Sequence, residues 1–132
     1  QVISQLIAAD EEACIVAGID NRDDGHNSYP VFPSLLECDV EADVVIDFSI
    51  ASAVDALIDS CVNKKLPCVL CTTGLTKEQL QKVSKATESI AVLRSANMSL
   101  GINMLFKLLK EAAAILTPAG FDIEIVENNV GI

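Results

Sequence analysis

The chain has 132 residues, of which 51% are apolar and 4% aromatic, so it can bury one hydrophobic core and its length indicates one domain. Nineteen acidic against nine basic residues give a net charge of -10, which leaves no basic surface for phosphates, and we expect no nucleic-acid binding. No apolar run approaches the ~20 residues of a membrane-spanning helix, and five cysteines are an odd number for a disulfide framework. We therefore expect a cytoplasmic protein without membrane contact.

The first third of the chain contains one helical pattern and one strand pattern. Apolar residues recur at helical spacing over residues 1–9, which predicts an amphipathic helix. Residues 14–20 form a short apolar run that ends at an acidic residue and is typical of a buried parallel strand. Polar residues, glycine and two prolines over residues 21–33 predict a loop, with a short helical turn at residues 34–37.

The middle of the chain alternates between strands and helices. Residues 44–49 read as a second apolar strand, and residues 51–64 carry apolar side chains along one helical face. A third strand is predicted at residues 68–72. The helix that follows starts at Thr76, because Thr76 and Gln79 match a capping box, in which each side chain satisfies a free backbone N–H of the first turn.

The last third continues the alternation. Residues 90–93 read as a fourth strand, Ser99 is placed to cap a helix over residues 99–116, and residues 123–126 alternate toward a fifth strand. Strands separated by helices require right-handed crossovers and favour a parallel sheet covered on both faces. The predicted fold class is α/β, with a doubly wound parallel sheet.

Ligands of such sheets bind beyond the carboxyl ends of the strands. The residues at these ends are Asp20, Arg22, Phe48, Ser49, Thr72, Thr73, Gly74, Ser95, Ala96, Asn97 and Met98. Asp20 is placed to accept hydrogen bonds from the ribose hydroxyls of an adenosine, but an Asp after a strand also forms turns. Thr72, Thr73 and Gly74 offer hydroxyls and close backbone approach, or simply make a strand-to-helix turn.

Other polar or reactive groups have plainer interpretations. Cys68 and Cys71 have the spacing of a redox or zinc pair, but a position within a strand argues against both roles, and we expect no metal site. His26 reads as a solvated loop residue. The Leu and Met residues along residues 99–116 read as core packing, with Lys107 and Lys110 on the solvated face.

Several ordered motifs together resemble one family, the 4-hydroxy-tetrahydrodipicolinate (dihydrodipicolinate) reductases. Residues 44–49 (Val-Val-Ile-Asp-Phe-Ser) are similar to a family strand that ends in Asp-Phe-Ser/Thr, and residues 71–74 (Cys-Thr-Thr-Gly) to its Gly-Thr-Thr-Gly turn. Residues 95–103 (Ser-Ala-Asn-Met-Ser-Leu-Gly-Ile-Asn) resemble its Ala-x-Asn-Phe/Met-Ser-x-Gly-x-Asn segment. Residues 122–127 (Asp-Ile-Glu-Ile-Val-Glu) resemble its strand leading into the substrate domain.

The resemblance implies hydride transfer from NADH or NADPH to a small cyclic imine, in a parent enzyme that assembles as a homotetramer through its carboxyl-terminal domain. It implies that Asp20 contacts the adenosine ribose and that Arg22 is the nearby cation for a 2′-phosphate. The cofactor-binding residues that it implies at the other strand ends are Phe48, Ser49, Cys71, Thr72, Thr73, Gly74, Ser95, Ala96, Asn97 and Met98. It assigns no catalytic residue to this chain.

Three departures from the family pattern affect this interpretation. The family's first strand and glycine-rich phosphate loop belong directly before Gln1, and its His-His pair and Lys belong after Glu127. Cys71 also stands where the family has glycine. We therefore interpret residues 1–127 as part of a dinucleotide-binding domain of a larger reductase, with residues 128–132 as a tail or a junction to the substrate domain. The alternative is a non-catalytic nucleotide-binding or interaction module, and we expect no turnover by this chain alone.

Overall fold

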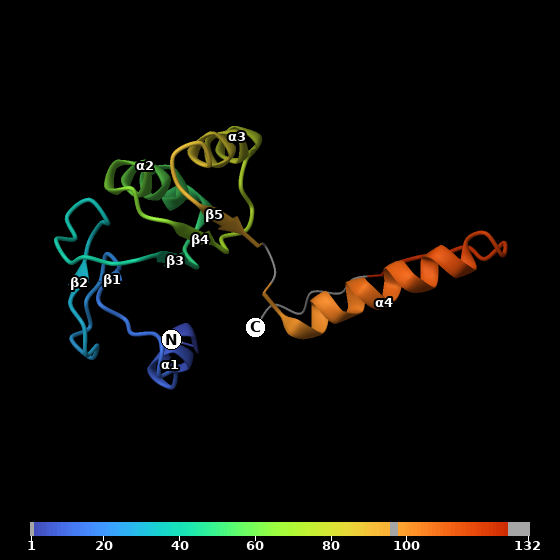
Figure 1. Ribbon diagram of the computed structural model, residues 1–132, viewed down its shortest axis with the longest axis horizontal. Helices are drawn as coiled ribbons and strands as arrows, with labels where there is room; N and C mark the ends of the chain where they lie inside the picture. Colours follow the sequence, from blue (N-terminus) through green and yellow to red (C-terminus); the bar gives the residue numbers. More distant parts are fainter. Residues whose placement is uncertain (1, 96–97, 127–132) are drawn as a thin grey trace. The chain divides into compact units, whose positions relative to one another are not determined.

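The computed structural model describes residues 2–95 and 98–126 of the chain. They belong to two compact units, Gln1–Ala96 and Asn97–Ile132, each of which is described by itself. Figure 1 shows the first unit as helices and short strands and the second as one long helix with its flanking segments.

The first unit contains two small parallel sheets. β1 pairs with β2, and the other sheet has the order β3-β4-β5 with Cys68 of β4 opposite Val45 and Val92. The elements in chain order are α1 (Val2–Ala8), β1 (Gly18–Ile19), β2 (Val31–Phe32), β3 (Val45–Asp47), η1 (Ala51–Ala53), α2 (Val54–Lys64), β4 (Cys68–Leu70), α3 (Lys77–Ala86) and β5 (Val92–Arg94). Both sheets are parallel because a helix or a long loop returns the chain between paired strands.

The hydrophobic core lies between the three-stranded sheet and the two helices α2 and α3, which Figure 1 shows on the same side of that sheet. Val54, Ile58 and Cys61 recur at helical spacing along α2 and are almost fully buried. They pack with Cys68 and Leu70, which point to the same face of β4 because side chains alternate along a strand. This packing holds the carboxyl ends of β3 and β4 in a fixed register.

Local signals explain where the helices of this unit begin and end. At the start of α3, Thr76 Oγ1 accepts from Gln79 N at 3.2 Å and Gln79 Oε1 accepts from Thr76 N at 3.1 Å, which is the predicted capping box. Helix α2 ends where Lys65 adopts a left-handed conformation with φ of 56° and Leu66 N donates to Cys61 O. Pro67 follows and cannot continue the helix.

The second unit is built around α4 (Leu100–Leu116). The Ser99 side chain caps it by accepting a hydrogen bond from Ile102 N, as predicted. None of its residues is buried, so within this unit the apolar residues of α4 have no core to contact, unlike the predicted packing. No helix in the part of the chain that the structure describes is both long enough and apolar enough to span a bilayer.

The predicted element types agree with the structure at most positions, and the α/β class with parallel strands is confirmed. One strand prediction and one loop prediction were wrong in extent. Of the residues 14–20 expected as a buried strand, only Gly18 and Ile19 are strand, and Val16 and Ile19 are exposed because this strand pairs on one edge alone. The predicted loop at 21–33 contains β2, which supplies that one partner.

Another prediction, a strand at residues 123–126, was wrong in the type of element. Residues 123–126 form no strand, because alternation creates a strand only where another strand supplies hydrogen-bond partners, and none pairs with this segment in the described residues. The short helical turn expected at 34–37 is a turn closed by the hydrogen bond from Glu37 N to Ser34 O. The strand predicted at residues 90–93 corresponds to β5, which begins at Val92, two residues later than predicted.

Candidate functional site

The carboxyl ends of β3, β4 and β5 meet at one edge of the three-stranded sheet. Asp47, Leu70 and Arg94 are in register there, so the segments that follow these strands lie next to one another. Ser95 N donates to Leu70 O at 3.0 Å, which ties the start of the segment after β5 to β4. The structure therefore brings together the predicted residues Phe48, Ser49, Cys71, Thr72, Thr73, Gly74 and Ser95.

A buried carboxylate organises this edge. Asp47 is 6% exposed, and its Oδ2 accepts from Thr72 Oγ1 at 2.6 Å while its Oδ1 accepts from Ser49 N at 3.1 Å. Its backbone carbonyl accepts from Cys71 N at 2.9 Å. The hydroxyls of Ser49 and Thr72 lie 3.5 Å apart. Asp47 thus links the end of β3 to the segment after β4 at two points, Thr72 and Cys71, and also holds the backbone of Ser49. The bonds from Thr72 Oγ1 and Ser49 N satisfy its buried carboxylate.

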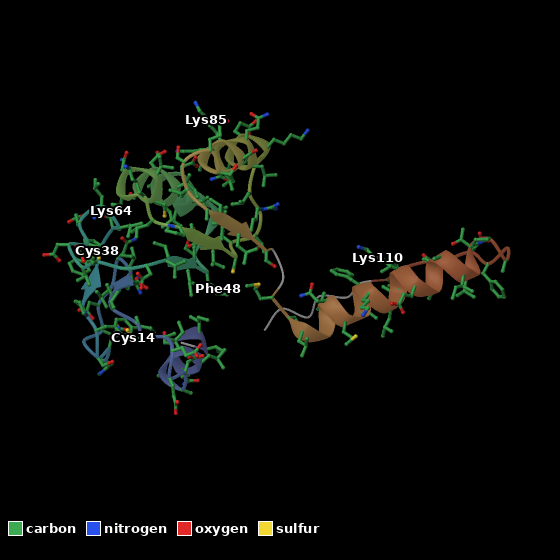
Figure 2. All side chains as sticks on the ribbon, in the orientation of Figure 1. Cys14, Cys38, Phe48, Lys64, Lys85 and Lys110 are labelled. Carbon is green, nitrogen blue, oxygen red and sulfur yellow. The ribbon has the colours of Figure 1, made fainter. Side chains whose placement is uncertain are left out.

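Other side chains at this edge are open to solvent. Phe48 is 55% exposed, and Figure 2 shows it at the end of β3, away from α2 and α3. Thr73 and Gly74 are exposed, whereas Thr72 is 3% exposed and turns its hydroxyl inward to Asp47. Gly74 has φ of 74°, a conformation that side chains disfavour, although a Cβ atom at this position would meet only open space. The edge therefore offers an aromatic ring, hydroxyls and accessible backbone.

Asp20 and Arg22 lie at the carboxyl end of β1, in the other sheet. Both are exposed, and Asp20 Oδ1 accepts from Arg22 N at 2.9 Å. This is the turn-forming role that an Asp after a strand often has. It occupies one carboxylate oxygen and leaves the ribose role of Asp20 as a hypothesis that no contact in the structure tests.

Three further predicted site residues, Ala96, Asn97 and Met98, follow Ser95 in the chain. Ala96 and Asn97 lie outside the residues that the structure describes, as do Glu127 and residues 128–132. Met98 belongs to the second unit and is half-exposed. The Ser95–Met98 segment therefore remains a prediction beyond Ser95.

All five cysteines are free thiols, and Cys14 alone among them is exposed. Burial, followed by the charge of Asp47, raises the pKa of the Cys71 thiol. A hydrogen bond with Cys61, together with burial, raises the pKa of the Cys68 thiol. Both thiols are therefore poor nucleophiles at neutral pH, because the thiolate is the reactive form. Among the described residues no group of His, Cys, Asp and Glu is arranged to hold a metal ion.

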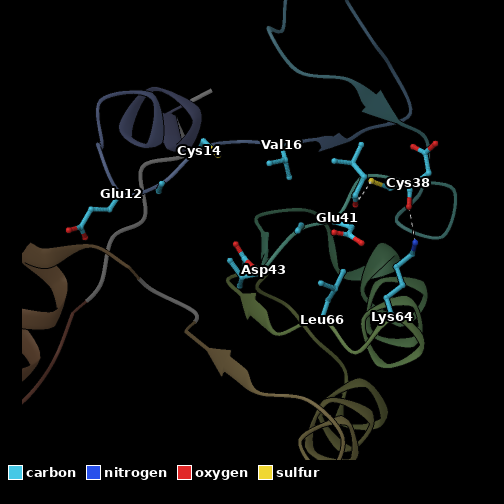
Figure 3. A pocket seen from close by; sticks show the side chains of 13 residues that line it. Glu12, Cys14, Val16, Cys38, Glu41, Asp43, Lys64 and Leu66 are labelled. Carbon is cyan, nitrogen blue, oxygen red and sulfur yellow. Dashed lines mark hydrogen bonds between the residues drawn. The ribbon is translucent and has the colours of Figure 1, made fainter.

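A groove with a volume of ≈ 680 Å³ lies at the opposite, amino-terminal ends of the strands (Figure 3). It is lined by residues that precede β1, between 12 and 16, by residues 38–44 that precede β3, and by Lys64 and Leu66 ahead of β4. Lys64 Nζ donates to Cys38 O at 2.8 Å across one side of it. The groove therefore lies between the two sheets, and the predicted site residues do not line it.

The charge of this groove is unfavourable for an anionic coenzyme. Its acidic lining residues are Glu12, Asp39, Glu41 and Asp43, and Lys64 is the single cation among its lining residues. The negative charges of these carboxylates would repel the phosphate groups of a coenzyme in the groove. This acidic lining therefore does not suit a dinucleotide.

The groove is also bordered by two unpaired strand edges. Gly18 N and Asp20 N donate toward β2, so the alternating residues of β1 turn their backbone groups toward the other edge. In the described part of the chain β1 pairs with β2 alone and β3 with β4 alone. An edge strand presents unpaired backbone N–H and C=O groups, so these two edges can pair with a further strand.

Sequence reasoning placed most of this edge but did not assign Asp47 a role. The signal was present, because Asp47 is the one charged residue of an otherwise apolar strand and lies within the Asp-Phe-Ser motif. A carboxylate at the end of a buried strand needs hydrogen-bond donors from neighbouring segments, and only the tertiary structure shows that Ser49 and Thr72 supply them.

Parallel strands, crossover helices and a hydroxyl-rich carboxyl edge define an α/β domain of the Rossmann-like class. The family model described as "Dihydrodipicolinate reductase, N-terminus" matches residues 1–98. The chain therefore belongs to the dihydrodipicolinate reductase family, and its match lies in the dinucleotide-binding N-terminal domain. A reductase family with such a domain implies a nicotinamide dinucleotide as coenzyme.

Similar proteins carry the corresponding enzyme name. The 4-hydroxy-tetrahydrodipicolinate reductases of Clostridium novyi (strain NT) and Caldanaerobacter subterraneus subsp. tengcongensis are each 46% identical over 129 residues, which cover 98% of this chain. That of Alkaliphilus oremlandii is 37% identical over 131 residues. These alignments cover 51%, 50% and 48% of the three relatives. The chain thus spans about half the length of the curated relatives it matches.

Proposed function

We propose that this chain is the coenzyme-binding part of a 4-hydroxy-tetrahydrodipicolinate reductase, which transfers hydride from NADH or NADPH to a cyclic imine. The family membership of residues 1–98 carries this proposal. The carboxyl-terminal edge of β3-β4-β5 supports it, because exposed aromatic, hydroxyl and glycine groups there fit an uncharged ring with an amide substituent.

The nicotinamide end of the coenzyme is assigned to this edge. Phe48 provides apolar contact area for a ring, and the exposed hydroxyls of Ser49 and Thr73 provide hydrogen-bonding partners. Gly74 keeps its backbone accessible at the turn. When bound, the coenzyme supplies the hydride, and the role of these residues is to hold and orient it.

The adenosine end is assigned to the end of β1. Asp20 retains a second carboxylate oxygen beside the one that accepts from Arg22 N, and ribose hydroxyls are donors of matching chemistry. Arg22 is the cation near this position that can face a 2′-phosphate. Because both Asp20 and Arg22 are present, we expect the reductase to discriminate only weakly between NADH and NADPH.

We also propose that the groove between β1 and β3 takes the strand that the family resemblance implies before Gln1. Such a strand would connect through α1 to β1, and a right-handed crossover places it beside β1 in parallel orientation. The unpaired edges of β1 and β3 and the apolar side chains of Val16, Val44 and Leu66 offer it backbone partners and burial. Its glycine-rich turn would then supply the N–H groups for the pyrophosphate.

The test compares two polypeptides, this chain and a version extended at both ends by the segments that the relatives carry. Coenzyme binding is followed by NADH and NADPH fluorescence, and imine reduction by loss of absorbance of the reduced coenzyme. We expect turnover only from the extended protein. Turnover by the 132-residue chain, or an extended protein that binds neither coenzyme, contradicts the proposal. Binding without turnover in the extended protein indicates a non-catalytic nucleotide-binding module instead.

Substitution of Asp20 by Asn in the extended protein checks the adenosine assignment. Loss of a charged acceptor for two ribose hydroxyls weakens binding by about tenfold or more for both coenzymes. Asp24→Asn, in the same exposed loop, is the matched control and leaves the affinity unchanged. Equal effects of the two substitutions contradict the assignment of Asp20.

A further inference from the structure

We propose that the buried carboxylate of Asp47 sets the direction of two hydroxyl groups, so that the exposed oxygen of Ser49 can only accept a hydrogen bond from a bound ligand. The ligand group that matches is the N–H of the nicotinamide carboxamide. This inference rests on the coenzyme-binding role proposed above and adds a positioning residue that acts through its neighbours.

The first step is the hydrogen bond between Thr72 and Asp47. Thr72 Oγ1 donates to Asp47 Oδ2 at 2.6 Å, within the short range of hydrogen bonds between a hydroxyl and a carboxylate. A threonine hydroxyl has one hydrogen and two lone pairs. Because its hydrogen is directed to Asp47, Thr72 Oγ1 has only acceptor capacity left for any other partner.

The second step passes this polarity to the surface. Ser49 Oγ lies 3.5 Å from Thr72 Oγ1, and since Thr72 can only accept, the Ser49 hydroxyl is the donor of this longer contact. Asp47 Oδ1 also accepts from Ser49 N at 3.1 Å, so the same carboxylate holds the Ser49 backbone in place. Ser49 is exposed, and with its hydrogen directed inward it presents lone pairs to the solvent.

The third step is the chemistry of the ligand that such a surface selects. Phe48, adjacent in sequence and 55% exposed, offers an aromatic face beside the Ser49 acceptor. An aromatic amide combines a flat ring with an N–H donor and matches both features, whereas a phosphate or carboxylate group brings only acceptors. Two parts of the coenzyme combine a flat ring with an N–H donor, the adenine with its amino group and the nicotinamide with its carboxamide. The adenosine end is assigned above to the end of β1, so the nicotinamide is the group assigned to this edge.

Asp47→Asn separates polarity from geometry. The Asn side chain can still accept from Ser49 N, but its NH₂ group donates to Thr72 Oγ1, after which the Thr72 hydroxyl donates to Ser49 and the Ser49 hydrogen turns outward. The substitution therefore turns the Ser49 hydrogen toward the ligand, where the unsubstituted protein presents only lone pairs, while it preserves the hydrogen-bonded contacts. Ser49→Ala removes the acceptor, and Thr72→Val disconnects the Ser49 hydroxyl from Asp47 while the Ser49 N–H still donates to Asp47 Oδ1.

The experiment uses the extended protein described under the proposed function, labelled with ¹⁵N, and two probes. These are reduced nicotinamide mononucleotide and its 3-acetylpyridine counterpart, whose ring substituent has no N–H donor. Dissociation constants come from the shift of the Ser49 amide signal or, in Ser49→Ala, of the Phe48 signal. We expect Asp47→Asn and Ser49→Ala to weaken the nicotinamide probe about fivefold to tenfold, the effect of one hydrogen bond, and to leave the acetylpyridine probe within about twofold. Asp59→Asn, on exposed α2 surface, is the control and changes neither constant.

Each remaining outcome has a definite meaning. If Asp47→Asn weakens both probes equally, the residue is only a structural link; if it weakens neither, the hydroxyl direction is irrelevant, and both results overturn this inference alone. In a Thr72→Val background Asp47→Asn should have no further selective effect, and a persistent one also overturns it. If the unsubstituted extended protein binds neither probe, the coenzyme-binding role itself fails and the inference fails with it.

Discussion

Gln79 connects the start of α3 to the helix pair that forms the core, and its removal is the most informative test of how the first unit is held together. Gln79 is buried, and its Oε1 accepts from Thr76 N at 3.1 Å. Its Nε2 donates to Ala51 O at 2.6 Å and to Asp55 Oδ2 at 2.8 Å. One side chain therefore caps α3 and at the same time joins it to η1 and α2.

The expected magnitude follows from these contacts. Gln79→Ala removes two hydrogen bonds to backbone groups, at about 1 kcal/mol each, so we expect a loss of about 2 kcal/mol in the free energy of unfolding. Thr76→Ala removes only the cap on Gln79 N and should cost about 1 kcal/mol. Because the two residues cap each other, the double substitution should cost less than the sum of the single ones.

The assay is urea unfolding followed by circular dichroism, with emission of Tyr29 as a second probe in the first unit. With a slope of about 2 kcal/mol per molar urea, the midpoint should fall by about 1 M for Gln79→Ala and by about 0.5 M for Thr76→Ala. Gln81→Ala, an exposed position on the same helix, is the control and should change the midpoint little. A midpoint for Gln79→Ala equal to that of Thr76→Ala would refute the link between α3 and η1.

Three further predictions concern single groups. In native protein at about pH 8, iodoacetamide should modify Cys14 first and leave Cys71 protected, because burial raises the pKa of the Cys71 thiol; equal labelling by mass spectrometry contradicts this. Gly74→Ala should cost about 1 kcal/mol in urea unfolding, since φ is 74° there, and an unchanged midpoint refutes the strain. A hydrogen bond from Gln79 lowers the pKa of Asp55. Its stabilisation is present above the unfolded pKa of about 3.9 and is lost as pH falls through the lower, folded pKa, so the cost of Asp55→Ala should shrink as the pH falls below about 3.9.

The exposed apolar surface of α4 shows what helical periodicity can predict and what it cannot. The spacing of Leu100, Met104, Leu105 and Leu108 located the helix and its cap at Ser99 correctly. It also predicted packing into a core, whereas these side chains are exposed within their own unit. Periodicity records that one face of a helix is apolar, but the partner of that face is a property of other segments of chain.

Local signals determined the element types and several of their boundaries. The Thr76 and Gln79 pair, the apolar run ending at Asp47 and the cap at Ser99 act through hydrogen bonds or alternation within a few residues, and each was readable without a structure. The order of motifs likewise identified the family to which residues 1–98 belong.

Tertiary structure decided what depends on residues far apart in the chain. Whether β1 has one partner or two, and whether Asp47 meets Thr72, depends on which strands and strand ends lie side by side. Strand pairing and the burial of a carboxylate both need donors and acceptors from distant segments, so the sequence near each residue cannot specify them. The sequence located the edge where the site lies, and the fold determined that Asp47 orders the hydrogen bonds within it.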